Sequence, residues 1–335
     1  MKRVVTVGET MALMSAERVG PLKHSPSLTL GIGGSESNVA IGLARLGVPV
    51  TWIGKVGSDA LGDLVIAQIA AEGVELRAIR DPDAPTGLMI KERRTGTHTR
   101  VWYYRRGFAG SRLRSDELDI DVLQKAALLH VSGISLALSA ELAEAVTEAI
   151  LVARAGGALV SFDLNFRRKL WSEEAAAAAY RDIIPLADIV FAGEEEAAIA
   201  LSSEPADGVG AGEGHRDGVG DANPARSAAA LADGLVKLGA HEAVVKRGAS
   251  GAVASVEGRT FEQAAVPIVP VDTVGAGDAF VAGYIAELLH GAPVPLRLRT
   301  AVAAGAYACL TDGDWEGLPT RDELDALFQI EPVTR

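Results

Sequence analysis

Short runs of β-branched and other apolar residues alternate with longer alanine-rich stretches along most of the chain. The short runs have the composition of buried strands, and the alanine-rich stretches have that of helices. This alternation predicts an α/β fold, with a mostly parallel sheet and helices on both of its faces. The expected core strands are Val4–Gly8, Val50–Val56, Leu128–Ser132, Leu159–Asp163, Ile189–Ala192 and Ala243–Lys246.

Two segments, Met11–Ile32 and Thr86–Tyr104, have strand composition without an intervening helix. They predict a small separate β layer, which we call the β lid. Residues Ser202–Arg226 are rich in Gly, Asp, Pro and Ala and lack a hydrophobic period, so we expect a flexible insertion. The expected domains are a large α/β domain of residues 1–10, 33–85 and 111–335, and the β lid of residues 11–32 and 86–110.

Bulk properties narrow the class of protein. A net charge of −12 over 335 residues argues against a nucleic-acid partner. A single cysteine, Cys309, excludes an intramolecular disulfide and a cysteine-based metal site. No apolar run approaches the roughly 20 residues of a membrane span, and the first residues have the pattern of a strand and not of a signal peptide. We therefore expect a cytoplasmic enzyme that does not bind a membrane.

The segment Asp272–Asp278 leads directly into an apolar helical stretch. Its glycines permit a tight turn, and the N–H groups of Gly275, Ala276 and Gly277 would neutralise an anion at the start of the helix. An acid beside such an anion site is useful as a general base, which makes Asp278 the candidate that deprotonates an attacking hydroxyl. The alternative interpretation is an ordinary helix cap.

A second glycine turn opens a helix at Gly31–Gly47 and contains Gly33, Gly34 and Asn38. Together the two turns resemble the paired signatures of the ribokinase-like (PfkB-type) sugar kinases, and the resemblance runs in order from about Val4 to Leu327. It implies a three-layer α/β/α fold with a small β-sheet lid, ATP and Mg²⁺ as cofactors, and Gly33, Gly34 and Asn38 as sugar contacts. In this family the lid often also forms the dimer contact, so we expect a homo-oligomer.

The segment Tyr103–Leu113 brings three arginines and two tyrosines next to the presumed sugar site. A guanidinium suits a carboxylate better than a neutral sugar, although a solvated basic strand would have the same composition. This segment resembles the Y-Y-R-x-x-S-A-x-S-R-L segment of 2-keto-3-deoxygluconate kinases. Asp163–Trp171 and Gly313–Pro319 likewise resemble the corresponding segments of these kinases. The resemblance implies substrate contacts from Tyr103, Tyr104, Arg105, Arg167, Asp272 and Asp314.

Three residues qualify this assignment. Arg167 could bind the substrate carboxylate or an ATP phosphate, or pair with a neighbouring acid. Phe108 stands where that branch usually has serine, and Met89 where a lid tyrosine is common. Both changes remove a hydroxyl, so they would loosen the discrimination between gluconate and galactonate epimers or indicate another acidic sugar.

The nucleotide side is expected at Val244–Gly251, which resembles the V-x-K-x-G-x-x-G segment at the family's ATP site. Lys246 or Arg247 would meet phosphate there, while a hairpin is the alternative. The helix Thr300–Leu310 would supply a wall for adenine, or be only a core helix. The full cofactor-binding set is Asn165, Lys246, Arg247, Gly248, Gly251, Gly275, Gly277 and Ala304.

Magnesium is held in kinases mainly by phosphates, with few protein carboxylates. Glu196 lies where the family has N-x-x-E and is the candidate that organises the water shell of the metal, unless it only stabilises a helix N-terminus. Asp163 and Asn165 could instead fix their own loop by side-chain hydrogen bonds. A requirement for a monovalent cation is left open.

The function predicted is transfer of the γ-phosphoryl group of Mg-ATP to the terminal hydroxyl of 2-keto-3-deoxygluconate, which forms 2-keto-3-deoxy-6-phosphogluconate. Three rivals remain: a ribokinase- or fructokinase-like enzyme acting on a neutral sugar, a non-catalytic sugar- or nucleotide-binding module, and a dinucleotide-dependent oxidoreductase. The last would need a G-x-G-x-x-G after the first strand, which Gly8–Met11 does not provide.

Overall fold

A computed structural model of the chain describes residues 3–95, 99–202 and 227–327. Apart from Ser202, the predicted insertion Ser202–Arg226 lies outside the described residues. Within them, one sheet of nine strands has the order β13-β12-β11-β10-β9-β8-β1-β4-β5 and is parallel from β5 to β11. Its strands are β1 (Val4–Val7), β4 (Val50–Gly57), β5 (Glu75–Asp81), β8 (Leu128–Ser132), β9 (Leu159–Asp163), β10 (Ile189–Gly193), β11 (Glu242–Lys246), β12 (Ala252–Val256) and β13 (Arg259–Gln263).

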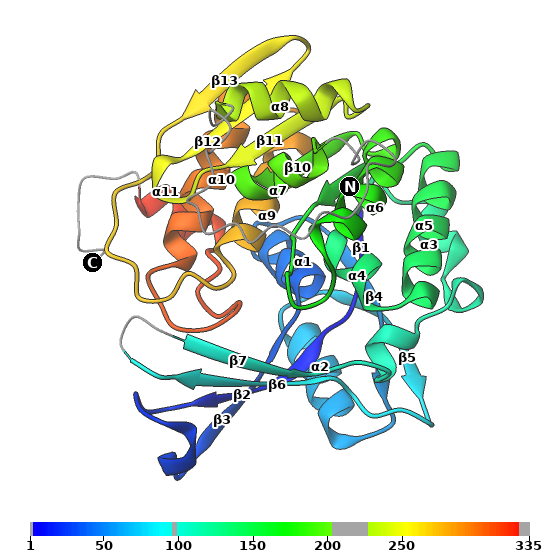
Figure 1. Cartoon of the computed structure of the whole chain (residues 1–335), viewed down its shortest axis with the longest axis vertical. Coiled ribbons are helices and arrows are strands. Elements are labelled where there is room, and N and C mark those ends of the chain that lie inside the picture. The colour runs from blue at the N-terminus through cyan, green and yellow to red at the C-terminus, as the bar shows by residue number, and fades with distance from the viewer. Residues whose placement is uncertain (1–2, 96–98, 203–226, 328–335) are drawn as a thin grey trace, which may run out of the picture.

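Helices cover both faces of this sheet, and each face has its own hydrophobic core (Figure 1). Successive strand residues point to opposite faces, so that Val131 and Val160 pack in one core while Leu128 and Phe191 pack in the other. The first core contains α3 (Ile120–Gln124), α4 (Gly133–Leu138), α5 (Ala140–Ala155), α6 (Glu173–Ile183), α7 (Glu194–Ala200) and α8 (Ala228–Lys237). The second contains α1 (Ser35–Arg45), α2 (Ala60–Ala71), α9 (Ala276–Leu289), α10 (Val294–Ala308) and α11 (Arg321–Leu327).

Many of these helices begin at a residue whose side chain caps the helix N-terminus. Side-chain oxygens accept a hydrogen bond from a first-turn N–H group and so satisfy a donor that the helix leaves without a partner. The residues that cap in this way are Asp59 at α2, Asp119 at α3, Ser132 at α4, Ser139 at α5, Ser172 at α6 and Ser227 at α8. No helix among the described residues is long and apolar enough to cross a membrane.

A four-stranded sheet, β3-β2-β6-β7, forms a separate layer beside the α/β body (Figure 1). Its strands are β2 (Met11–Ala16), β3 (Leu28–Gly33), β6 (Leu88–Arg93) and β7 (Thr99–Tyr104). The expected three-layer fold with a small second sheet is therefore confirmed, and all six expected core strands are present. We call this second layer the small sheet.

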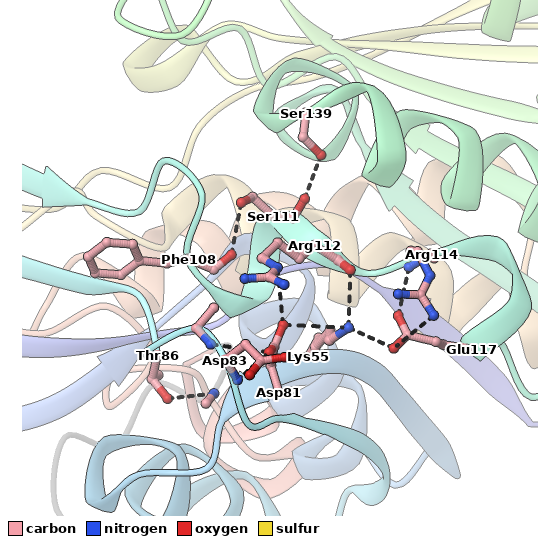
Figure 2. Close-up of polar contacts among 12 residues, drawn as sticks. Lys55, Asp81, Asp83, Thr86, Phe108, Ser111, Arg112, Arg114, Glu117 and Ser139 are labelled. Carbon is pink, nitrogen blue, oxygen red and sulfur yellow. Dashed lines mark hydrogen bonds and ion pairs between the residues drawn. The ribbon is translucent and has the colours of Figure 1, made fainter.

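Charged side chains gather where the chain enters and leaves the small sheet (Figure 2). The buried Nζ of Lys55 donates to Oε1 of Glu117 at 2.6 Å and lies 3.6 Å from Oδ2 of Asp81. The same Asp81 oxygen lies 3.3 Å from Nε of Arg112. Asp81 ends β5, before the chain enters β6 and β7 of the small sheet, and Arg112 follows β7. This cluster therefore ties the segments before and after these two strands to β4.

Candidate active site

The start of α9 faces the carboxyl ends of the parallel strands, where ligands of such sheets bind. Gly275 precedes the helix with φ +76°, and a Cβ there would lie 2.0 Å from the carbonyl oxygen of Asp314. A side chain is therefore excluded both by the backbone conformation and by the neighbouring loop. Asp278 stands in the first turn of α9, together with Ala276 and Gly277.

The carboxylate of Asp278 is held by the first turns of α1. Oγ of Ser35 donates to its Oδ1 at 2.8 Å, and Nδ2 of Asn38 donates to its Oδ2 at 2.8 Å. Nδ2 of Asn165 in turn donates to Oγ of Ser35 at 2.7 Å, from a residue with φ 42°, a left-handed conformation that Asn tolerates. A relay of hydrogen bonds thus fixes the orientation of the carboxylate.

Burial raises the pKa of Asp278 from 3.8 to about 7. The hydrogen bonds from Asn38 and Ser35 oppose this rise because they stabilise the charged form, whereas the negative charge of Asp163 adds to it. The nearby charge of Arg167 also lowers the pKa of Asp278. A carboxyl with a pKa near neutrality exchanges protons readily at physiological pH, as a general base must.

Lys246 or Arg247 was expected to meet phosphate at the nucleotide side, and of these two Lys246 lies beside α9. Nζ of Lys246 pairs with both carboxylate oxygens of Asp163 at 2.8 Å and lies 3.8 Å from where a Cβ of Gly277 would be. Arg247 instead pairs with Glu262 at 2.7 Å, at the turn between the antiparallel strands β11 and β12. Gly248 and Gly251 belong to that turn, with φ +52° and +93°, so the segment is a hairpin, as the alternative interpretation had it.

Two further residues that were predicted to contact the metal or the nucleotide, Glu196 and Ala304, have structural roles. Glu196 accepts hydrogen bonds from the backbone N–H groups of Phe166 at 2.9 Å and Gly193 at 2.6 Å, which closes the N-terminus of α7. Ala304 is buried in the core between α9 and α10. Both match the structural alternative weighed for them, and their cofactor roles stay predictions. Among the described residues, no group of three His, Cys, Asp or Glu side chains could hold a metal by itself.

The predicted sugar side lies around the glycines before α1. A Cβ on Gly34 would lie 2.4 Å from the carbonyl oxygen of Glu9, and a Cβ on Gly33 would lie 2.5 Å from Oδ2 of Asp314. Within the described part of the chain, Oδ1 of Asn38 and Oγ1 of Thr10 are buried without a hydrogen-bond partner. Buried polar atoms of this kind suit a polyhydroxylated ligand, which can satisfy them.

Arg105 is already paired. Its Nε donates to Oε2 of the buried Glu9 at 2.6 Å, and its guanidinium lies over the ring of Tyr103, 5.7 Å from the centroid. Tyr103 and Tyr104 are themselves exposed. Arg167 donates to the carbonyl oxygen of Phe166 at 3.4 Å. A guanidinium has five N–H donors, so these contacts leave donors for a substrate carboxylate.

Asp272 and Asp314 surround a cation from the small sheet. Nζ of Lys91 lies 2.7 Å from Oδ2 of Asp272 and 3.3 Å from Oδ1 of Asp314. Both aspartates stay predicted substrate contacts, and Oδ2 of Asp314 lies toward Gly33.

The structure adds four residues that the motifs did not indicate, namely Glu9, Thr10, Ser35 and Lys91. Ser35 had a signal, because it follows Gly34 directly and lies one helical turn before Asn38. Lys91 had a weaker one, since it shares its strand face with the buried Met89.

Comparison with solved structures identifies the class. A candidate ribokinase II from E. coli, solved in complex with ATP and Mg²⁺, superposes with a TM-score of 0.84 at 26% identity, over 99% of this chain and 100% of that chain. The fold is thus ribokinase-like.

Residues 1–321 match the pfkB family carbohydrate kinases. The chain is 36% identical over 330 residues to the 2-dehydro-3-deoxygluconokinase of Bacillus subtilis (strain 168), which covers 98% of this chain and 95% of that protein. It is 32% identical over 327 residues to the 2-dehydro-3-deoxygalactonokinase of Haloferax volcanii, covering 97% and 96%. The chain belongs to the pfkB family of carbohydrate kinases, and it is a phosphotransferase that acts on a hydroxyl group.

Proposed function

We propose that this kinase uses ATP to phosphorylate the terminal hydroxyl of a sugar acid, 2-keto-3-deoxygluconate (2-dehydro-3-deoxygluconate), with Asp278 as general base. The observation that carries this proposal is the environment of Asp278. Its carboxylate is buried, is oriented by Ser35 and Asn38, and has a pKa raised to about 7 at the N-terminus of α9. The 36% identical relative named for this reaction supports the choice of acceptor.

On the nucleotide side, Gly275, Ala276 and Gly277 form the start of α9, and Nζ of Lys246 lies 3.8 Å from the Cβ position of Gly277. A helix N-terminus and a lysine together favour an anion, so these residues fit the phosphates of ATP. Bound Mg-ATP supplies the phosphoryl group that is transferred. Magnesium would be held mainly by those phosphates and water, and Glu196 is the carboxylate predicted to organise its water shell.

On the acceptor side, Asp278 takes the proton of the attacking hydroxyl, which makes the oxygen a better nucleophile as the new P–O bond forms. Gly33, Gly34, Thr10 and Asn38 would hold the sugar hydroxyls. Arg105 and Arg167 would hold the carboxylate of the acid, since a guanidinium matches a carboxylate in shape and charge. Glu9 keeps Arg105 in place without using all of its donors.

The small sheet would act as a lid that keeps water from competing with the sugar as acceptor. Its outer strands expose Leu30, Trp102 and Tyr104 on one face, with exposed fractions of 53%, 39% and 50%. Exposed apolar and aromatic side chains grouped on one sheet favour burial against a second copy, so we expect a homo-oligomer formed through the small sheet.

A substrate panel tests this proposal. The panel contains 2-keto-3-deoxygluconate, its galactonate epimer, ribose and fructose, and ADP release is measured with a coupled enzyme assay at saturating Mg-ATP. We expect the two acids to give a kcat/KM at least about 100-fold above the neutral sugars, because a carboxylate forms charge-assisted hydrogen bonds with a guanidinium that a neutral sugar cannot form. A neutral sugar as best acceptor would refute the choice of a sugar acid.

The galactonate epimer is the second candidate acceptor. The buried side chain of Met89 reaches Gly33 at the sugar side, at a position where the resembled kinases commonly have a tyrosine. A thioether discriminates poorly between hydroxyl epimers, so we expect the two acids to differ by less than about 10-fold in kcat/KM. A larger difference would mean that other polar groups read the epimeric carbon.

A further inference from the structure

Lys91 is a buried cation that the small sheet directs into the α/β body. Its side chain is 5% exposed, and its Nζ reaches Oδ2 of Asp272 at 2.7 Å and Oδ1 of Asp314 at 3.3 Å. The three charged groups come from β6, from the segment before α9 and from the loop after α10. Two acids share one base in this cluster, so the lysine is the group that offsets most of their mutual repulsion.

Each of the two aspartates is tied to the turn that begins α9. Oδ1 of Asp272 accepts a hydrogen bond from the N–H group of Val274 at 3.2 Å. The carbonyl oxygen of Asp314 lies against Gly275, where a Cβ would approach it to 2.0 Å. The turn that presents Gly275, Ala276 and Gly277 therefore rests on both residues that Lys91 holds.

The same lysine also connects this turn to the sugar side. Oδ2 of Asp314 lies 2.5 Å from the Cβ position of Gly33, and Cε of Met89, on the same face of β6 as Lys91, lies 2.2 Å from that position. Burial raises the pKa of Asp314. At Asp272 burial acts in the same direction, but the hydrogen bond and charge of Lys91 and the backbone hydrogen bonds of Val274 and Gly313 together lower the pKa. Lys91 makes its shorter contact with Asp272, at 2.7 Å against 3.3 Å for Asp314.

We propose that Lys91 is a positioning residue for phosphoryl transfer: through Asp272 and Asp314 it fixes the turn at Gly275–Gly277, so that a side chain of the small sheet completes the anion site. This inference rests on the proposed function of that turn. Its consequence is that the small sheet acts on the transfer step as well as on sugar binding. Removal of the Lys91 ammonium should therefore lower kcat more than it changes KM.

The test replaces Lys91 by Ala and measures kcat and KM for Mg-ATP and for the best acceptor of the wild-type enzyme. We expect kcat to fall by about 100-fold, as misplacement of a reacting group does, while either KM changes by less than about threefold. Added n-propylammonium chloride should restore at least about a tenth of the lost kcat, since the ion fits the vacated space and restores the charge. Tetramethylammonium chloride at the same concentration, which has no N–H donors, should not.

Arg93→Ala is the matched control. Arg93 lies two residues further along β6 and also reaches the α/β body, where it pairs with Asp312 at 3.2 Å on the surface. We expect its kcat to stay within about twofold of wild type, because an exposed ion pair contributes little, and to be insensitive to the amine. Turnover by the wild-type enzyme is measured first, so a failure of the proposed acceptor is seen before any variant is compared.

A second variant covers the case in which Lys91→Ala does not fold. Lys91→Met combined with Asp314→Asn restores the net charge of the cluster, and it should fold while its kcat stays at least about tenfold below that of Asp314→Asn alone. The proposal is overturned if Lys91→Ala keeps kcat within about threefold of wild type. It is equally overturned if both ammonium salts rescue alike, or if the double variant regains the kcat of Asp314→Asn.

Discussion

Replacing Asp278 by Asn should stabilise the fold above neutral pH. Burial raises the pKa of this carboxyl from 3.8 to about 7. The native state therefore binds more protons than the unfolded state between these two values, and the free energy of unfolding falls as the pH rises through this window. A shift of roughly 3 units corresponds to about 4 kcal/mol, which the wild-type protein loses by pH 8.5.

The Asp278→Asn variant does not regain the whole of this lost free energy of unfolding. Asp278 accepts hydrogen bonds from Ser35 and Asn38, both at 2.8 Å, and an Asn side chain has only one oxygen to accept them. One mispaired donor costs about 1–2 kcal/mol, so the expected net gain at pH 8.5 is about 2–3 kcal/mol. At pH 4.5, less than one unit above the unfolded-state pKa of 3.8, the wild-type protein has lost only about 1 kcal/mol of this stability, so the cost of mispairing should cancel the gain from the amide.

Urea denaturation followed by circular dichroism at pH 8.5 and pH 4.5 measures this difference. Asp121→Asn, on the exposed surface of α3, is the control and should change the free energy of unfolding equally at both pH values. The reasoning is refuted if Asp278→Asn is no more stable relative to wild type at pH 8.5 than at pH 4.5.

Two further predictions concern named contacts. Ser35→Ala removes the donor to Oδ1 of Asp278, so the pKa of the base should rise further and the acidic limb of kcat/KM should move up by about one unit. Ser37→Ala, whose hydroxyl donates to the carbonyl oxygen of Gly34, should leave that limb in place, and an unmoved or lowered limb in Ser35→Ala would contradict the assignment. Lys55→Met leaves Asp81 and Glu117 without their buried cation (Figure 2) and should lower the free energy of unfolding by about 3 kcal/mol, measured by urea denaturation. Lys125→Met, at an exposed ion pair with Asp121, should have no measurable effect, and an equally small effect at Lys55 would show that Arg112 alone neutralises Asp81.

The layers of the fold were predictable because buried parallel strands are short apolar runs, as at Leu128–Ser132 and Leu159–Asp163. Strand β5 escaped prediction because it lies at the edge of the sheet, where its charged residues Glu75, Arg77 and Arg80 are tolerated. Pattern reasoning works where burial on both faces dictates composition. It fails where one edge is open to solvent.

The residues of the candidate site also differ in whether the sequence alone could predict them. Asp278 was indicated by the glycines directly before it, which is a local signal, and Asn38 by the resemblance of its glycine turn to the sugar-kinase signature. The partners of Lys91 and Glu9 lie 181 and 96 residues away in the sequence, so only the folded chain brings them together. At Arg247 the local pattern left two interpretations open, because a cation beside a glycine turn is typical of a hairpin as well as of a phosphate site.

The most direct test of the central claim is the kcat of Asp278→Asn with Mg-ATP and the best acceptor of the panel, at pH 8.5, where the wild-type carboxylate is charged. The account predicts a kcat at least about 100-fold below wild type, because an amide cannot take the proton of the acceptor hydroxyl. Affinity for Mg-ATP, measured by calorimetry, should be retained or increased, since a negative charge beside the phosphates is removed. A kcat close to that of the wild-type enzyme would contradict the role of Asp278 as the base.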